Sequence, residues 1–229
     1  MNIIQYSDRK EQAEALAAQV AGQLRAVISA GGKAGIALSG GSTPAPFMQA
    51  LATHSLDWSG VNVTLTDERC VDDTHERSNA RLVKENLLGA VPDATFFPLF
   101  PGECVDAALL AKESVLSEML PATACVLGMG PDGHFASLFP EADQLAEGLD
   151  VDNARLTLPM QVPGVPDIRI SLTLQAILKS ASLHLLITGE EKLAVLKQAE
   201  ADKEAGDFPL PVCHLLQHAG ERLVIHYAD

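Results

Sequence analysis

The chain has 229 residues and a formal net charge of −14, and 47% of its residues are hydrophobic. This length can bury one sizeable core, so we expect a single domain that spans residues 1–229. The acidic charge argues against a general binder of nucleic acid or of anionic membranes.

The cysteines and the hydropathy of the chain indicate the cellular compartment in which the protein is located. The four cysteines, at positions 70, 104, 125 and 213, form no Cys-x-x-Cys pair, which is typical of reduced thiols. Residues 1–12 lack the apolar core of a signal peptide, and no apolar run is long enough to span a bilayer. We therefore expect a soluble, cytoplasmic protein with no membrane partner.

Predicted helices and strands alternate along the chain. Asp8 and Glu11 have the spacing of a capping box, and apolar residues then recur at helical spacing until Gly31 and Gly32. The other predicted helices cover residues 45–53, 78–88, 106–120 and 190–201. The predicted strands cover residues 34–38, 61–65, 95–100, 124–127, 155–160, 168–172, 183–188 and 223–227. This alternation predicts an α/β fold with a mostly parallel sheet and helices on both faces.

Residues 39–44 read Ser-Gly-Gly-Ser-Thr-Pro and join a predicted strand to a predicted helix. The paired glycines expose backbone N–H groups, Ser42 or Thr43 can cap the helix, and Pro44 suits its first turn. A helix N-terminus reached through such a loop is a ready anion site. An ordinary capped turn between a strand and a helix is an equally good interpretation.

Three cations stand near the predicted ends of elements. Arg69 closes the run Asp67-Glu68-Arg69 after the second sheet strand, where it can contact a phosphate, a carboxylate or a developing oxyanion. Arg169 begins a strand and Lys192 begins a helix, so either can complete a phosphate pocket. Taken alone, each of these residues is more typical of a solvated surface charge.

Residues 127–140, LGMGPDGHFASLFP, carry the strongest chemical signal. Their glycines allow sharp turns and deliver Asp132 and His134 beyond the end of a strand, where open α/β sheets bind ligands. Histidine is suited to proton transfer near neutral pH, and Asp132 can orient its ring or hold a substrate hydroxyl. A turn-forming Asp and a backbone-bonded His are simpler alternatives. The glycines also fit a dinucleotide fingerprint, which Pro131 and Pro140 make improbable.

Other motifs in the chain predict no metal or hydrolase centre. His214 and His218 stand four residues apart, but Leu215 occupies the position where a zinc metalloprotease needs Glu. We expect helical histidines there, with no metal and no cofactor. The chain also lacks a Gly-x-Ser-x-Gly elbow, which argues against a serine hydrolase.

Together these motifs resemble the 6-phosphogluconolactonase type of the glucosamine-6-phosphate isomerase/6-phosphogluconolactonase family. The matching pieces follow the family order over most of the chain: LSGGSTP, TDER with the later Ser78-Asn79, LGMGPDGHFASLFP, RISLT from residue 169 and GEEK ending at residue 192. The resemblance implies a Rossmann-like α/β fold. It also implies hydrolysis of 6-phosphoglucono-δ-lactone to 6-phosphogluconate, a step of the oxidative pentose phosphate pathway.

By position, the resemblance implies a role for each candidate residue. His134 would be the general base with Asp132 beside it, and Asp67 and Arg69 would line the sugar end. The phosphate end would be formed by Gly40, Gly41, Ser42, Thr43, Arg169 and Lys192. We accordingly expect a small-molecule sugar-phosphate substrate, no nucleic-acid partner, and a monomer or a weak homo-oligomer.

The chain departs from the family pattern at two places. Cys70-Val71-Asp72 stands where the family usually has an aromatic residue and Val-Pro, which leaves the shape of that loop open. Phe139 stands where the related deaminases carry the Glu that they need for ring-opening proton transfers, so lactone hydrolysis is favoured. A sugar-phosphate deaminase or isomerase remains one alternative. A non-catalytic sugar-phosphate sensor is another. Such sensors usually carry a DNA-binding helix-turn-helix, whereas here only one helix precedes the first predicted sheet strand and the net charge is −14.

Overall fold

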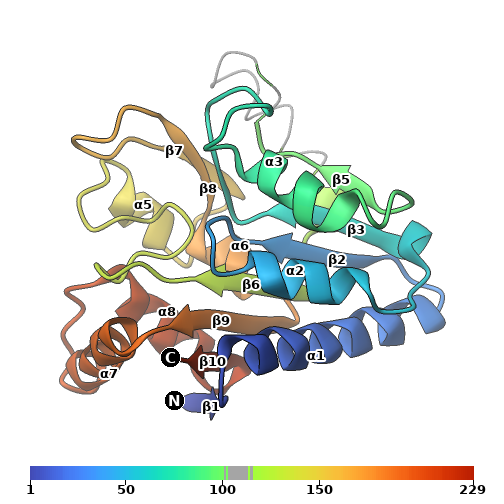
Figure 1. Cartoon of the computed structure of the whole chain (residues 1–229). Helices are drawn as coiled ribbons and strands as arrows, with labels where there is room; N and C mark the ends of the chain where they lie inside the picture. The colour runs from blue at the N-terminus through green and yellow to red at the C-terminus, as the bar shows by residue number, and fades with distance from the viewer. Residues whose placement is uncertain (101, 103–112, 114–115) are drawn as a thin grey trace.

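A seven-stranded sheet forms the centre of the molecule (Figure 1). The computed structural model describes residues 1–100, 102, 113 and 116–229. The strand order is β1-β10-β9-β6-β2-β3-β5, and every neighbouring pair is parallel. The strands are β1 (Asn2–Gln5), β2 (Ala34–Leu38), β3 (Val61–Leu65), β5 (Thr95–Phe97), β6 (Ala124–Gly128), β9 (Ser182–Thr188) and β10 (Leu223–Ala228). The predicted α/β fold with a mostly parallel sheet is confirmed.

Helices cover both faces of this sheet, as the alternation of elements predicts. They are α1 (Arg9–Ser29), α2 (Ala45–Ala52), α3 (Asn79–Val83), α5 (Leu145–Leu149), α6 (Leu174–Leu178), α7 (Glu190–Glu204) and α8 (Pro211–Ala219). A π-turn, Lys84–Leu88 (η2), extends α3, and short 3₁₀ turns form Trp58–Gly60 (η1) and Gly220–Arg222 (η3). Figure 1 shows α1 and α2 in front of the sheet and α6 and α8 behind it.

The two faces follow from the direction in which the chain crosses the sheet. From β1 through β2 and β3 to β5 the chain moves one way, and from β6 through β9 to β10 it moves the other way. Because crossovers between parallel strands are right-handed, these two halves place their helices on opposite faces. The neighbours β2 and β6 therefore send their following loops to opposite faces. A crevice opens beyond their carboxyl ends, which is where open α/β sheets bind ligands.

A second, antiparallel sheet was not foreseen. Its order is β4-β8-β7, with β4 (Asp67–Arg69), β8 (Arg169–Leu172) and β7 (Thr157–Met160). The sequence predicts strands at β7 and β8 without separating them from the parallel sheet, and it predicts no strand at β4. It misses this sheet because β4 pairs with a segment far along the chain, and sequence periodicity does not report such a partner.

Helix boundaries match their sequence signals with some differences. The Asp8 side chain accepts from the amide of Glu11 at 2.8 Å and caps α1, while Glu11 reaches the amide of Ser7 at 2.8 Å rather than that of Asp8. The Ser78 side chain caps α3 by accepting from the amide of Arg81 at 3.2 Å. The predicted helix at 106–120 lies mostly outside the described residues. Within its span, residues 116–119 are described and are helical. Strand β1 and the short helices α5 and α6 were not predicted.

A chain of polar groups crosses the buried space between α1 and the sheet. The Tyr6 hydroxyl lies 2.8 Å from His226 Nδ1, His226 Nε2 lies 3.1 Å from His184 Nδ1, and His184 Nε2 lies 3.2 Å from Gln23 Oε1. An amide oxygen only accepts, so His184 carries its proton on Nε2 and accepts from His226, which in turn accepts from Tyr6. This arrangement requires both imidazoles to be neutral, which agrees with their lowered pKa values. Burial lowers the pKa of His184 to about 4, and burial together with His184 lowers the pKa of His226 to about 3.

These two histidines are expected to make the fold acid-sensitive. Their pKa values are lower in the folded protein than in the unfolded chain, so the unfolded state binds more protons below about pH 6.5. The free energy of unfolding is therefore unaffected by these histidines above that pH, and it decreases as the pH falls toward 3–4. At pH 5 the loss is about 2 kcal/mol for each histidine. Urea unfolding at pH 7.5 and pH 5 measures it.

The matched variant for this test is the double substitution His184→Gln and His226→Gln, which cannot titrate. We expect its stability to fall less than that of the wild type between pH 7.5 and pH 5, whatever its absolute value. Equal losses in the two proteins would contradict the assignment.

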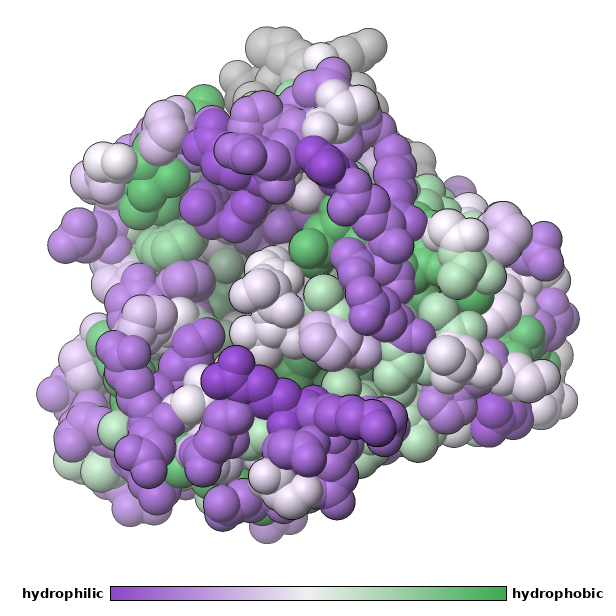
Figure 2. All heavy atoms as spheres, viewed as in Figure 1, coloured by the Kyte–Doolittle hydropathy of each residue, from purple (hydrophilic) through white to green (hydrophobic). Residues whose placement is uncertain are grey.

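Few large hydrophobic side chains are exposed among the described residues. The large hydrophobic side chains that are exposed among the described residues are Met1, Ile4 and Ile168. Figure 2 shows that the face toward the viewer is largely hydrophilic, with scattered apolar residues. None of the helices in the described part of the chain is long and apolar enough to cross a membrane.

Candidate active site

A cavity of about 310 Å³ opens at the crevice beyond β2 and β6. The loop after β2, the segment after β6, β4 and the starts of β8 and α7 all contribute to its wall. Nine of the ten residues predicted from the sequence line it: Gly40, Gly41, Ser42, Thr43, Asp67, Arg69, His134, Arg169 and Lys192. The tenth, Asp132, contacts the side chain of His134 instead.

His134 and Asp132 form a short hydrogen-bonded pair. His134 Nδ1 lies 2.5 Å from Asp132 Oδ1, and the His134 amide donates to the same oxygen at 3.3 Å. A carboxylate accepts, so Nδ1 carries the ring proton and Nε2 is left as a proton acceptor. The His134 side chain is 25% exposed, and that of Asp132 is 44% exposed. The imidazole is thus oriented, partly shielded and able to accept a proton from the cavity.

Gly130 is required by the close approach of this pair to the backbone. A Cβ at this position would lie 2.3 Å from His134 Nδ1 and 2.5 Å from Asp132 Oδ1. The Gly130 amide also donates to the carbonyl of His134 at 2.9 Å. Gly133 has a φ of +74°, a conformation that side chains other than glycine rarely adopt. The glycines of this segment therefore allow the imidazole to lie directly against the backbone of its own loop.

Substituting Gly130→Ala is expected to displace the His134–Asp132 pair. The added methyl group overlaps both side chains, so the imidazole must move, and a displacement of about 1 Å costs up to about 10²-fold in rate. Measuring kcat and the melting temperature separates this effect from unfolding. Gly22→Ala is the matched control, because a Cβ there meets nothing within 4 Å. Equal kcat values in the two variants would contradict the expectation.

Arg69 and Arg169 face each other across the second sheet. They are direct partners in the antiparallel register of β4 and β8, and like charges placed opposite one another are destabilising. Burial lowers the pKa of Arg169, and the nearby Arg69 lowers it further. The Nε atoms of both residues are buried without a hydrogen-bond partner in the described part of the chain. Both features favour the binding of anionic groups by these two guanidinium groups.

Lys192 and the start of α2 add to the positive character of the cavity. Lys192 lies in the first turn of α7, and burial lowers the pKa of its ammonium group. The expectation that Ser42 or Thr43 caps α2 is wrong, because Pro44 occupies the cap position and no side chain accepts there. The reason is that Pro44 already has a helical backbone conformation. Both hydroxyls are therefore left uncommitted to the helix.

Ser39 is a lining residue that the sequence reasoning missed. Its Oγ is buried and has no hydrogen-bond partner among the described residues, while its amide donates to Val126 at 3.0 Å. Ser39 directly precedes the glycine pair of the loop, which is the signal that could have identified it.

Asp67 holds the second sheet against the segment that carries His134. Its carboxylate accepts from the hydroxyl of Ser137 at 2.6 Å, and its carbonyl accepts from the side chain of Asn79 at 2.8 Å. Asn79 in turn packs on Gly40, where a Cβ would lie 1.9 Å from the Asn79 Oδ1 atom. Asp67 thus lines the cavity and also fixes the relation between its walls.

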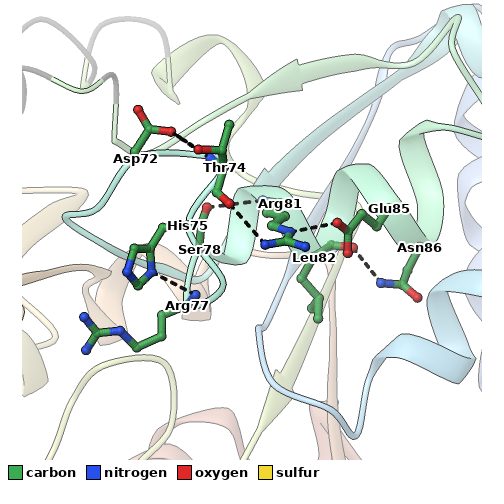
Figure 3. A network of polar contacts seen from close by, with 9 residues as sticks. All are labelled: Asp72, Thr74, His75, Arg77, Ser78, Arg81, Leu82, Glu85 and Asn86. Atoms are coloured by element: carbon green, nitrogen blue, oxygen red, sulfur yellow. Dashed lines mark hydrogen bonds and ion pairs between the residues drawn. The ribbon is translucent and has the colours of Figure 1, made fainter.

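The loop between β4 and α3 is held by hydrogen bonds among its own residues (Figure 3). The amide and hydroxyl of Thr74 donate to Asp72 at 2.9 and 2.6 Å, and the amide of Arg77 donates to His75 at 3.1 Å. The loop so held offers the Arg77 carbonyl, which accepts from Arg69 Nη1 at 2.5 Å. Asp72 therefore helps to order the loop at the place where the chain departs from the family pattern.

The candidate metal histidines lie elsewhere. His214 is on α8 and packs against Phe208, with ring centroids 5.1 Å apart. Within the described ranges, no three His, Cys, Asp or Glu side chains are grouped closely enough to hold a metal ion.

Comparison with known proteins places this chain among described relatives. The family model described as glucosamine-6-phosphate isomerases/6-phosphogluconolactonase matches residues 7–225. The chain is 42% identical over 212 residues to a 6-phosphogluconolactonase of Pseudomonas putida, covering 92% of this chain and 88% of that one. It is 41% identical over 219 residues to one of Rhizobium meliloti, covering 94% of each. A crystal structure of a 6-phosphogluconolactonase from Shewanella baltica matches with a TM-score of 0.91 and 32% identity, over 100% of this chain and 98% of that one.

Proposed function

The chain belongs to the glucosamine-6-phosphate isomerase/6-phosphogluconolactonase family, and we propose that it hydrolyses 6-phosphoglucono-δ-lactone to 6-phosphogluconate. The observation that carries the proposal is the hydrogen-bonded pair of His134 and Asp132 in a cavity that three cations also line. The cavity thus combines a proton acceptor with groups that suit a phosphate.

His134 is the general base of the proposed reaction. Its Nε2 takes a proton from a water molecule as that water attacks the lactone carbonyl carbon. The Asp132 carboxylate keeps the ring in the required tautomer and supports the imidazolium that forms. Such acid–base assistance is worth about 10²–10⁴-fold in rate.

The attack converts the carbonyl oxygen into an oxyanion. Arg69 or backbone N–H groups of the cavity wall stabilise this charge while it exists. The tetrahedral intermediate then collapses, the bond between the carbonyl carbon and the ring oxygen breaks, and the imidazolium of His134 protonates that oxygen. The products are the open-chain acid and the neutral imidazole, so protons balance over the cycle.

The phosphate group is held by the cationic part of the site. We assign this to Arg169 and Lys192, to the hydroxyls of Ser42 and Thr43, and to the backbone of Gly40 and Gly41, which line the same cavity. Planar guanidinium groups and backbone amides at a helix start both suit phosphate oxygens. Binding at this end contributes by positioning the lactone carbonyl near His134.

The whole of residues 1–229 is proposed as one sugar-phosphate domain, because the small sheet supplies Asp67, Arg69 and Arg169 to a cavity that the large sheet also lines. Cys70, Cys125 and Cys213 are free thiols, which agrees with a location in the reducing cytoplasm. We also propose that the protein is a monomer or a weak homo-oligomer and that it binds no nucleic acid.

The test is hydrolysis of freshly generated 6-phosphoglucono-δ-lactone, followed through NADP reduction by 6-phosphogluconate dehydrogenase. The spontaneous opening of the lactone is subtracted. A rate proportional to the concentration of the protein is expected. A rate equal to the background with folded protein would reject the proposal, and release of ammonia from glucosamine 6-phosphate would then be measured.

A further inference from the structure

The ring of Phe139 contacts two groups with different proposed tasks. It stacks on the imidazole of His134, with ring centroids 3.9 Å apart and planes inclined by 26°. The guanidinium carbon of Arg169 lies over the same ring, 4.9 Å from its centroid. A cation within about 6 Å of an aromatic centroid is attracted by the ring. One side chain therefore touches both the proposed base and a proposed phosphate ligand.

The imidazole of His134 needs a restraint beyond its hydrogen bond. Asp132 holds the ring at Nδ1 and sets its tautomer, but contact at one edge leaves the plane of the ring free to tilt. The close stack on Phe139 removes that freedom because a tilted imidazole would collide with the neighbouring ring. Nε2 is then held in one direction.

Arg169 needs a restraint for an electrostatic reason. It faces Arg69 across the strand pair, so before any anion is bound the two guanidinium groups repel each other. The face of an aromatic ring carries negative potential and attracts a guanidinium group. Phe139 thus offers Arg169 a favourable position in the absence of an anion.

We propose that Phe139 is a positioning residue that couples the base His134 to the phosphate ligand Arg169 and so sets the spacing between them. The inference rests on the proposed function for the tasks of these two residues. The contacts themselves join a segment after β6 to a strand of the second sheet, so the ring links the two walls of the cavity.

The first test compares kcat and KM for lactone hydrolysis in three variants. Phe139→Leu removes the aromatic face, and we expect kcat to fall about 10-fold and KM to rise about 3- to 10-fold. Phe139→Tyr keeps the ring and should stay within about 2-fold of the wild type in both constants. Phe96→Leu alters another half-buried ring, on the edge strand β5, and controls for a general packing defect. Effects of Phe139→Leu no larger than those of Phe96→Leu would overturn the inference.

The second test needs no turnover. Calorimetry of 6-phosphogluconate binding is made on the wild type, Phe139→Leu, Arg169→Ala and the double variant. Phe139→Leu should weaken binding about 3- to 10-fold when Arg169 is present and less than about 2-fold when it is absent. Equal weakening in both backgrounds would show that the ring acts by packing alone, and would overturn the coupling. A wild type that binds 6-phosphogluconate but does not hydrolyse the lactone would reject the proposed function, while this cycle would still decide the role of Phe139.

Discussion

Replacing His134 by Ala is expected to lower kcat for lactone hydrolysis by about 10²–10⁴-fold, because the variant has no group that can take the proton of the attacking water. KM and the melting temperature should change little, since the imidazole is a quarter exposed and lies on a loop. Steady-state kinetics with the spontaneous rate subtracted, together with thermal unfolding, measure both effects.

Two further variants make this test specific. Asp132→Asn keeps the shape of the neighbour but can donate as well as accept, so a fraction of the imidazoles adopts the wrong tautomer. We expect a loss of kcat smaller than that of His134→Ala. His218→Ala removes an exposed histidine of α8 and should leave kcat unchanged. Turnover near the wild-type value in His134→Ala would remove His134 from the role of base.

Replacing Arg169 by Ala is expected to raise KM by about 10- to 10²-fold, because a charge-assisted hydrogen bond to phosphate is worth about 1.5–3 kcal/mol. The fall in kcat should be much smaller, since the guanidinium group holds the substrate and does not transfer a proton. Lys192→Ala should act in the same direction. Lys197→Ala, on the exposed side of the same helix, is the matched control.

The stability of the Arg169→Ala variant separates binding from structure. Removing Arg169 relieves its repulsion with Arg69 and also loses its contact with Phe139, so the melting temperature measured without ligand should change little. Added 6-phosphogluconate should raise the melting temperature of the wild type more than that of the variant. Unchanged KM values in both Arg169→Ala and Lys192→Ala would exclude these residues from the phosphate site.

The expected acid sensitivity and the expected effect of Gly130→Ala arise in different parts of the structure. The loss of stability expected at pH 5 comes from His184 and His226, which lie under α1 and do not line the cavity. The effect of Gly130→Ala arises in the cavity wall and should appear in kcat.

Local signals made the order of elements predictable. The alternation of strands and helices, the caps at Asp8 and Ser78, and the glycines around His134 each depend on residues close together in the chain. Right-handed crossovers between parallel strands then limit where the ends of β2 and β6 can meet. This accounts for the candidate residues after β2 and β6, whereas Asp67, Arg69 and Arg169 reach the same cavity from the second sheet.

The sequence by itself determined the fold class, the family resemblance and the set of candidate residues, because these follow from local periodicity and short motifs. The tertiary structure alone decided that Arg69 and Arg169 are strand partners and that Phe139 lies against both His134 and Arg169. It also decided that Pro44, rather than a hydroxyl side chain, begins α2. The two contacts depend on the register and packing of segments far apart in the chain, and the cap depends on the backbone conformation that the folded loop adopts.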